Sequence, residues 1–158
     1  MSDKAAGQKA RSSPEFTRPY TKVYWTLASN FPFSYVAIDE LISIVDDDES
    51  VRQGLSRLLT SVGFAVNTFA SAEEYLSSDE LERADCLILD IRMSGMSGIE
   101  LQRQLVANQS EVPVIFITAH EEETERVQAL EGAARTVLIK PFSEEALLNA
   151  ISKALTAQ

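Results

Sequence analysis

Apolar residues gather in five short runs between residues 41 and 139, separated by longer stretches of mixed character. Four of these runs are almost continuously apolar, which is typical of strands covered on both faces of a parallel sheet. The second run is less apolar than the others. The predicted strands are Leu41–Val45, Phe64–Phe69, Cys86–Leu89, Val114–Ile117 and Val137–Ile139.

The stretches between the runs carry helical signals. Apolar residues recur at helical spacing over residues 51–62, with Asp48 as a predicted N-cap and Gly63 as a predicted stop. Ser71 and Glu74 have the spacing of a capping box at the start of a second helix. The remaining predicted helices are an apolar stretch from Ile99 to Val106, the polar residues 121–131, and a stretch that begins at Ser143.

Five strands that alternate with five helices predict a doubly wound α/β fold. Pro141 cannot lie inside a helix, so it separates the last strand from the last helix. Glu121–Glu123 is interpreted as a solvated helix start, which the helix dipole favours. Cys86 lies inside an apolar strand and is interpreted as an unreactive core residue.

Residues 1–39 differ from the regular part of the chain. They hold seven of the twelve aromatic residues without a period of a strand or helix, and their opening stretch is small and polar. We interpret residues 1–39 as an N-terminal extension that is disordered, tag-like or translated from an upstream start, and residues 40–158 as the domain. The alternative is an aromatic arm that packs on the domain or on a partner.

The charge is as uneven as the pattern. The chain has a net charge of −10: residues 1–39 carry five Lys/Arg and three Asp/Glu (+2), and residues 40–158 carry nine and twenty-one (−12). A domain this acidic is a poor direct binder of nucleic acid, because such binding depends on cations that neutralise phosphates. It suits a metal ion or a basic partner instead.

Several function classes are disfavoured by composition. A single cysteine forms no internal disulfide and agrees with a reducing, cytoplasmic setting. We find no run of eighteen apolar residues and no secretory signal, so we expect no contact with a membrane.

Polar residues follow four of the predicted strands directly. They are Asp46 and Asp47 after the first strand, Asp90 after the third, Thr118 after the fourth and Lys140 after the fifth. Ligands of open parallel sheets bind at the carboxyl ends of the strands, so these side chains are the candidate site. Core packing alone does not require acids, a hydroxyl and an amine at these places.

The chemistry of this set is consistent. Three carboxylates close together repel one another, and a hard divalent cation such as Mg²⁺ relieves the repulsion while keeping room for phosphate oxygens. Phosphoryl transfer requires mainly positioning and charge neutralisation, which a cation and Lys140 could supply. Aspartate is a known phosphoryl nucleophile, so Asp90 is the candidate acceptor.

These residues, in this order, resemble the receiver domains of two-component response regulators, and some phrases resemble the FixJ-like branch. The likeness runs from about residue 41 to 156. The stretches that carry it are Ile44–Asp48, Leu89–Gly98, Val114–Ala119 and Lys140–Phe142, with Gly63-Phe64 and Ser71–Glu73 for the branch.

The resemblance implies a CheY-like (flavodoxin-like) three-layer sandwich with strand order 2-1-3-4-5 and a cis Lys140-Pro141 bond. It implies that Asp90 accepts a phosphoryl group from a sensor histidine kinase, that Thr118 and Lys140 contact this group, and that the chain is a signalling phosphoacceptor rather than a conventional enzyme. The implied ligands of Mg²⁺ (or Mn²⁺) are Asp46, Asp47, Asp90 and the backbone carbonyl of Arg92.

The resemblance also implies partners. The fourth helix, fifth strand and fifth helix usually form the face that contacts a downstream protein, an output domain or a second copy in a phosphorylation-dependent homodimer. FixJ-like receivers often precede a DNA-binding domain, so this chain is interpreted as a stand-alone receiver or a fragment. We expect no direct DNA binding by the chain itself.

Three departures from the family pattern change the expectations. Ser94 stands where a proline is usual, so we expect a less rigid loop after Asp90. Val137 stands where a switch aromatic is usual, and residues 132–140 are one residue longer than usual, so we expect a different readout of phosphorylation.

Two neighbouring side chains and two other functions stay open. His120 could tune the lifetime of the phosphoryl group or be solvated, and Arg92 could reach that group or lie on the surface. One competing function is a haloacid-dehalogenase-type phosphatase, suggested by Asp46-x-Asp48-x-Ser50. The other is an interaction module that kept the receiver fold without being phosphorylated.

Overall fold

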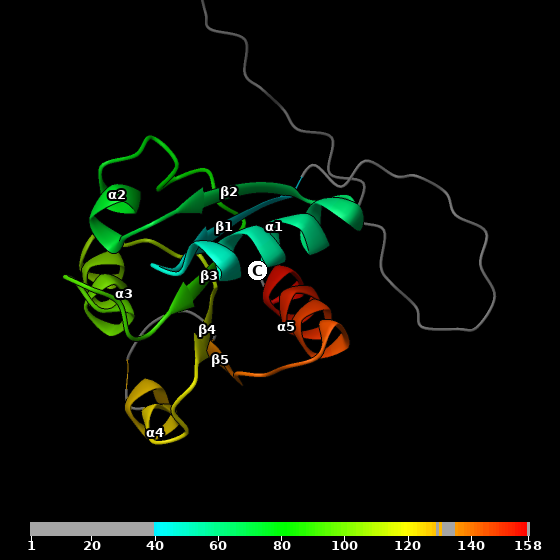
Figure 1. Cartoon of the computed structure of the whole chain (residues 1–158). Helices are drawn as coiled ribbons and strands as arrows, with labels where there is room; N and C mark the ends of the chain where they lie inside the picture. Colours follow the sequence, from blue (N-terminus) through cyan, green and yellow to red (C-terminus); the bar gives the residue numbers. More distant parts are fainter. Residues whose placement is uncertain (1–39, 129, 131–134, 158) are drawn as a thin grey trace, which may run out of the picture. The chain divides into compact units, whose positions relative to one another are not determined.

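The computed structural model describes residues 40–128, 130 and 135–157, so the predicted extension 1–39 and residues 132–134 of the predicted longer segment 132–140 lie outside the described residues. Strands and helices alternate along this part of the chain (Figure 1). The strands are β1 Leu41–Val45, β2 Ala65–Phe69, β3 Cys86–Asp90, β4 Val114–Thr118 and β5 Arg135–Ile139. The helices are α1 Glu49–Ser61, α2 Ala72–Leu76, α3 Gly98–Ala107, α4 Glu123–Gln128 and α5 Glu144–Thr156.

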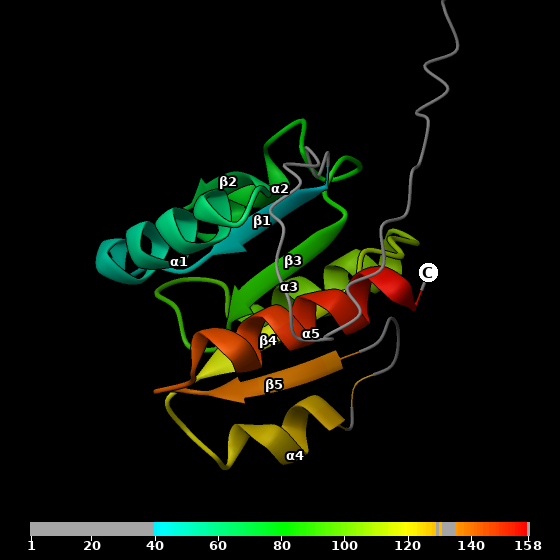
Figure 2. The same ribbon diagram turned by 90° about the vertical axis from the view of Figure 1, so that its right-hand side faces the viewer.

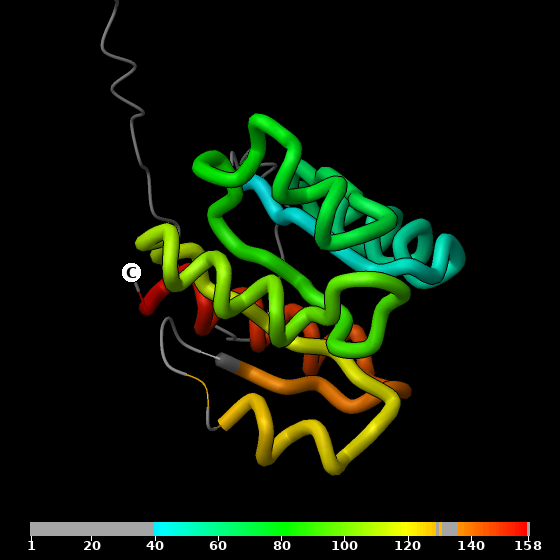
Figure 3. Tube along the Cα trace, turned by 90° about the vertical axis from the view of Figure 1, so that its left-hand side faces the viewer, coloured from blue at the N-terminus to red at the C-terminus, as the bar shows by residue number. Residues whose placement is uncertain are grey.

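The five strands form one parallel sheet with the order β2-β1-β3-β4-β5, so the predicted fold class and strand order are confirmed. Two helices, α1 and α5, cover one face of the sheet (Figure 2). The opposite face is covered by α2, α3 and α4 (Figure 3). The result is the expected three-layer sandwich.

Burial on both faces explains the continuous apolar runs. In β3, Leu87 and Leu89 pack on the side of α2, α3 and α4, while Cys86 and Ile88 pack on the side of α1 and α5. Successive side chains of a strand point to opposite faces, so both sets must be apolar when both faces are covered. The second strand, β2, lies at the edge of the sheet, and only Phe69 of its residues is buried, which agrees with its weaker apolar pattern.

The helix ends follow local chemistry, with one correction. Asp48 caps α1 by accepting from two backbone N–H groups, and Gly63 just after it has φ of 103°, a conformation that glycine adopts without strain. The predicted capping box at Ser71 is only half formed: Glu74 accepts from the N–H of Ala70 rather than from that of Ser71. Ser143 caps α5 as predicted.

A complete capping box occurs instead at the start of α3, where Ser97 and Glu100 exchange hydrogen bonds with each other's backbone N–H. Several bounds also differ from the predictions: β2 begins at Ala65, β3 ends at Asp90, β4 ends at Thr118, β5 begins at Arg135, and α3 begins at Gly98. The fourth helix, α4, is Glu123–Gln128, and residues 129 and 131 of the predicted 121–131 lie outside the described residues.

The Lys140-Pro141 peptide bond is cis, as the resemblance implied. Among the described residues, no helix is both long and apolar enough to cross a membrane.

Candidate functional site

The register of the parallel strands brings the predicted residues to one edge of the sheet. Val45 pairs with Leu89, so Asp46 and Asp90, the next residues, are neighbours. Asp90 itself pairs with Ile117, which places Thr118 one step further along β4. Thr118 pairs with Ile139, and its carbonyl accepts from the N–H of Lys140 at 2.7 Å.

Asp46, Asp90 and Lys140 form a close group of charges. The Nζ of Lys140 lies 3.2 Å from Oδ2 of Asp46 and 3.7 Å from Oδ1 of Asp90. Asp46 is fully buried, Asp90 is 7% exposed, and the ammonium end of Lys140 approaches them from a partly exposed position. A second oxygen of Asp46 accepts from the N–H of Asp48 at 2.9 Å, so this carboxylate is held at both oxygens.

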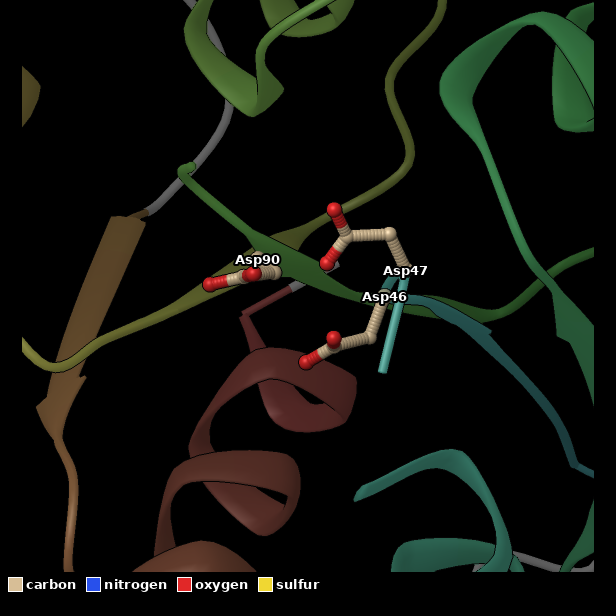
Figure 4. Close-up of side chains that lie close together, drawn as sticks. All are labelled: Asp46, Asp47 and Asp90. Atoms are coloured by element: carbon tan, nitrogen blue, oxygen red, sulfur yellow. The ribbon is translucent and has the colours of Figure 1, made fainter. Parts of the chain in front are cut away.

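Three carboxylates meet in this group (Figure 4). One oxygen from each of Asp46, Asp47 and Asp90 lies within 4.8 Å of the others. Burial, followed by the negative charge of Asp46, raises the pKa of Asp90 from 3.8 to about 6, while Lys140 acts in the opposite direction. One ammonium group therefore does not fully compensate three carboxylates.

This excess of negative charge fits a divalent cation. Carboxylate oxygens are the ligands that Mg²⁺ and Mn²⁺ prefer. A cation among them would offset the repulsion from Asp46 and Asp47, which adds to burial in raising the pKa of Asp90. The residues that could hold it are Asp46, Asp47 and Asp90. A role for the backbone carbonyl of Arg92 stays a prediction.

Asp47 differs from the other two carboxylates because it is exposed. Its Oδ2 accepts from the backbone N–H of Ser94 at 3.0 Å and from the hydroxyl of Ser94 at 3.3 Å. The loop between β3 and α3 therefore contacts one of the candidate ligands directly. Sequence reasoning noted Ser94 as a departure from the family pattern but did not identify these hydrogen bonds.

The side chain of Arg92 turns to α4, which answers the question left open by the sequence. Its Nε lies 3.0 Å from Oε1 of Glu123, and its second nitrogen lies 2.9 Å from Oε1 of Glu122. Arg126 contacts the other oxygen of Glu123 at 2.8 Å. The guanidinium of Arg92 is half exposed and pairs with these acids at the start of α4.

Glu123 corrects the interpretation of Glu121–Glu123 as a solvated helix start. Its side chain is only 3% exposed, and two arginines bracket its carboxylate. Charge alone could not reveal this, because the partner Arg92 is 31 residues away along the chain. Glu122, in contrast, is exposed as expected; backbone hydrogen bonding is the main factor that lowers its pKa, with smaller effects from His120 and Arg92.

The remaining candidates take simple positions. Thr118 is buried, and its Oγ1 accepts from the N–H of His120 at 3.1 Å. His120 is partly exposed, and its Nδ1 lies 3.2 Å from Oε1 of Glu122. Cys86 is fully buried and its pKa is raised to about 12, mainly by burial, which agrees with an unreactive core thiol.

Asp48 serves as the N-cap of α1, where its side chain accepts from the N–H groups of Ser50 and Val51. Asp48 is part of Asp46-x-Asp48-x-Ser50, the motif that suggested a haloacid-dehalogenase-type phosphatase. Its engagement with the helix start weighs against that competing function.

Val137 is half-buried and packs against the core on the side of α2, α3 and α4. It stands where a switch aromatic is usual in the family, and the different readout of phosphorylation stays a prediction.

Comparisons with known proteins agree with this geometry. The family model described as the response regulator receiver domain matches residues 42–152. The response regulator protein TodT of Pseudomonas putida is 43% identical over 115 residues, covering 73% of this chain and 51% of that protein. The transcriptional regulatory protein FixJ of Rhizobium meliloti is 39% identical over 116 residues, covering 73% of this chain and 57% of that protein.

The crystal structure of FixJ-N is 37% identical in sequence and matches with a TM-score of 0.67 over 76% of this chain and 96% of that one. The chain spans about half the length of the curated relatives it matches, 51% for TodT. On the family match, the sheet order and these relatives, the chain belongs to the response regulator receiver domain family of two-component signalling proteins.

Proposed function

We propose that this receiver accepts a phosphoryl group on Asp90 from a phosphohistidine of a sensor histidine kinase, in a reaction that depends on Mg²⁺ or Mn²⁺. The observation that carries the proposal is the group of Asp46, Asp47 and Asp90 within 4.8 Å, with the ammonium of Lys140 3.7 Å from Asp90. In this proposal Asp90 is the acceptor, the three carboxylates bind the divalent cation, and the ammonium of Lys140 neutralises a phosphoryl oxygen.

The transfer uses the ionised form of Asp90. One carboxylate oxygen attacks phosphorus and forms a new P–O bond, while the bond between phosphorus and the histidine nitrogen breaks and its electron pair stays on the imidazole. A pKa of about 6 leaves Asp90 mostly ionised at neutral pH, so it can act as the nucleophile. The bound cation supplies charge neutralisation for the carboxylates and the phosphoryl oxygens.

The other residues of the edge have positioning roles in this proposal. Lys140 binds a phosphoryl oxygen, because its Nζ already lies beside Asp90. Thr118 donates its hydroxyl hydrogen to a different phosphoryl oxygen, because within the described part of the chain this hydroxyl accepts from the N–H of His120 and donates no hydrogen bond. The backbone carbonyl of Arg92 would be a further ligand of the cation.

The proposed partners and cellular location rest on the family and on one exposed apolar side chain. We propose a cytoplasmic location and an output face formed by α4, β5 and α5, where Ile139 is a large apolar side chain with 36% exposure. This face would contact a downstream protein, an output domain or a second phosphorylated copy. FixJ is named as a transcriptional regulatory protein, which supports a role in the control of transcription. The net charge of −12 over residues 40–158 favours an output domain or partner as the DNA-binding part.

Intact mass spectrometry after incubation with acetyl phosphate and Mg²⁺ tests the proposal. We expect one added phosphoryl group, mapped to Asp90, and no addition in Asp90→Asn or without a divalent cation. Asp79→Asn is the matched control, because Asp79 is an exposed aspartate away from the site. Label on Asp46 would favour the phosphatase alternative. No label, together with no spectral change on adding beryllofluoride and Mg²⁺, would favour the non-phosphorylated module.

A further inference from the structure

Ser94 makes two hydrogen bonds to a single oxygen of Asp47, from its N–H at 3.0 Å and its hydroxyl at 3.3 Å. We infer that Ser94 is a positioning residue for the divalent cation, and that its backbone N–H holds Asp47 in the orientation that presents a carboxylate oxygen to Asp46 and Asp90. This inference rests on the proposed cation site and adds a residue that sets its affinity.

Asp47 needs such a restraint more than the other two carboxylates. Asp46 is buried and accepts hydrogen bonds from Asp48 and Lys140, and Asp90 is buried at the end of β3. Asp47 is exposed, and Ser94 provides the hydrogen bonds to its side chain among the described residues. An unrestrained side chain loses rotamer entropy when it binds a cation, which weakens binding.

The geometry of Asp47 leaves it available for a cation while Ser94 holds it. Both donors converge on Oδ2, and within the described residues no donor contacts Oδ1. Figure 4 shows one oxygen of Asp47 directed toward Asp90 and the other directed away. Partners that orient a ligating carboxylate in this way commonly strengthen metal binding.

The loop that carries Ser94 is itself held on both sides. The N–H of Met96 donates to Oε1 of Glu73 at 2.9 Å, which ties the loop to α2. The N–H of Gly98 donates to the carbonyl of Ile91 at 2.9 Å, which closes the loop on itself. Ser94 therefore presents its N–H from a defined position.

The family's usual proline could not act in this way, because proline has no backbone N–H. Two explanations of this position thus make opposite predictions. If loop rigidity decides cation affinity, a proline at residue 94 should strengthen binding. If the hydrogen bond to Asp47 decides it, the proline should weaken binding.

Isothermal titration calorimetry of the full chain with MgCl₂ separates the two explanations. Ser94→Ala keeps the N–H and removes the weaker hydroxyl contact, so we expect affinity within about twofold of the original chain. Ser94→Pro removes both donors, so we expect affinity roughly tenfold weaker than in Ser94→Ala, the lower end of the loss typical for a partner that orients a metal ligand. Equal or tighter binding by Ser94→Pro would overturn the inference.

Failure of the inference can be told apart from failure of the proposed function. If the original chain shows no saturable Mg²⁺ binding, the proposed cation site and the role of Ser94 both fail. If it binds Mg²⁺ and Asp47→Asn weakens the binding, but Ser94→Pro matches Ser94→Ala, only the role of Ser94 fails. Circular dichroism checks that each variant is folded.

A second measurement needs no variant of Ser94. Water-exchange NMR reports how fast the Ser94 amide exchanges with solvent, with Asp47→Ala as the reference without the hydrogen bond. We expect slower exchange in the original chain than in that reference, with protection retained at saturating Mg²⁺. Exchange as fast as in the reference would show that the bond does not hold Asp47 and would overturn the inference.

Discussion

Asp90 is predicted to reduce the stability of the cation-free protein at neutral pH. Its pKa is raised from 3.8 to about 6, chiefly by burial and by Asp46, so folding makes the ionised form less favourable. The difference of about two pKa units corresponds to roughly 3 kcal/mol at most. A variant that removes the charge of Asp90 also loses the ion pair with Lys140, and this loss would reduce the gain in stability below about 3 kcal/mol.

The sign of the pH dependence follows from the direction of the shift. Because the folded-state pKa lies above the unfolded-state value, the stabilising contribution of protonated Asp90 is fully present below about pH 4. It is lost as the pH rises through about 6. Asp90→Asn cannot ionise, so its advantage over the original chain should grow with pH across this window.

Urea unfolding in the presence of EDTA measures this advantage. We expect Asp90→Asn to be more stable by about 1–3 kcal/mol near pH 7.5, with about half of that gain near pH 5. The matched control Asp79→Asn removes the same charge from an exposed position and should show no such trend. Mg²⁺ should stabilise the original chain and narrow the gap, because a ligand bound only by the folded state stabilises it.

The reasoning is refuted if Asp90→Asn gives no gain near pH 7.5, or the same gain at both pH values. The first result would mean that Lys140 compensates the buried carboxylates. The second would mean that the gain comes from packing rather than from ionisation.

Three further changes test other parts of the structure. Glu123→Gln should lower the free energy of unfolding in urea by about 1–2 kcal/mol, because it weakens the two arginine contacts of a buried carboxylate. Glu122→Gln, at an exposed position, should have no measurable effect, and equal effects of the two variants would contradict the buried ion pair. Asp48→Ala should lower stability by about 1 kcal/mol through loss of the α1 cap, and unchanged stability would show that the cap is replaced by solvent. Gly98→Ala would place a Cβ 2.2 Å from the carbonyl oxygen of Asp90. We expect the free energy of unfolding to fall by roughly 2–3 kcal/mol and the Mg²⁺ affinity measured by calorimetry to fall as well. A variant with the stability and the Mg²⁺ affinity of the original chain would show that the backbone shifts freely.

The sequence by itself determined the fold and the composition of the site. Continuous apolar runs are what a sheet covered on both faces requires, and residues directly after the strands lie at one edge of a parallel sheet whatever the details of packing. For this reason Asp46, Asp90 and Lys140 could be placed together before any coordinates. The caps at Asp48 and Ser143 were equally accessible, because capping depends on neighbours within a few residues.

Only the tertiary structure decided the contacts between distant segments. Glu123 has the sequence signature of an exposed acid, yet its side chain is buried and pairs with Arg92, which is 31 residues away along the chain. Ser94 reaches Asp47 across 47 residues, and much of the contact is a backbone N–H, which side-chain identity does not report. Local pattern sets which face of an element is apolar, but long-range polar pairing depends on loop paths that the pattern does not encode.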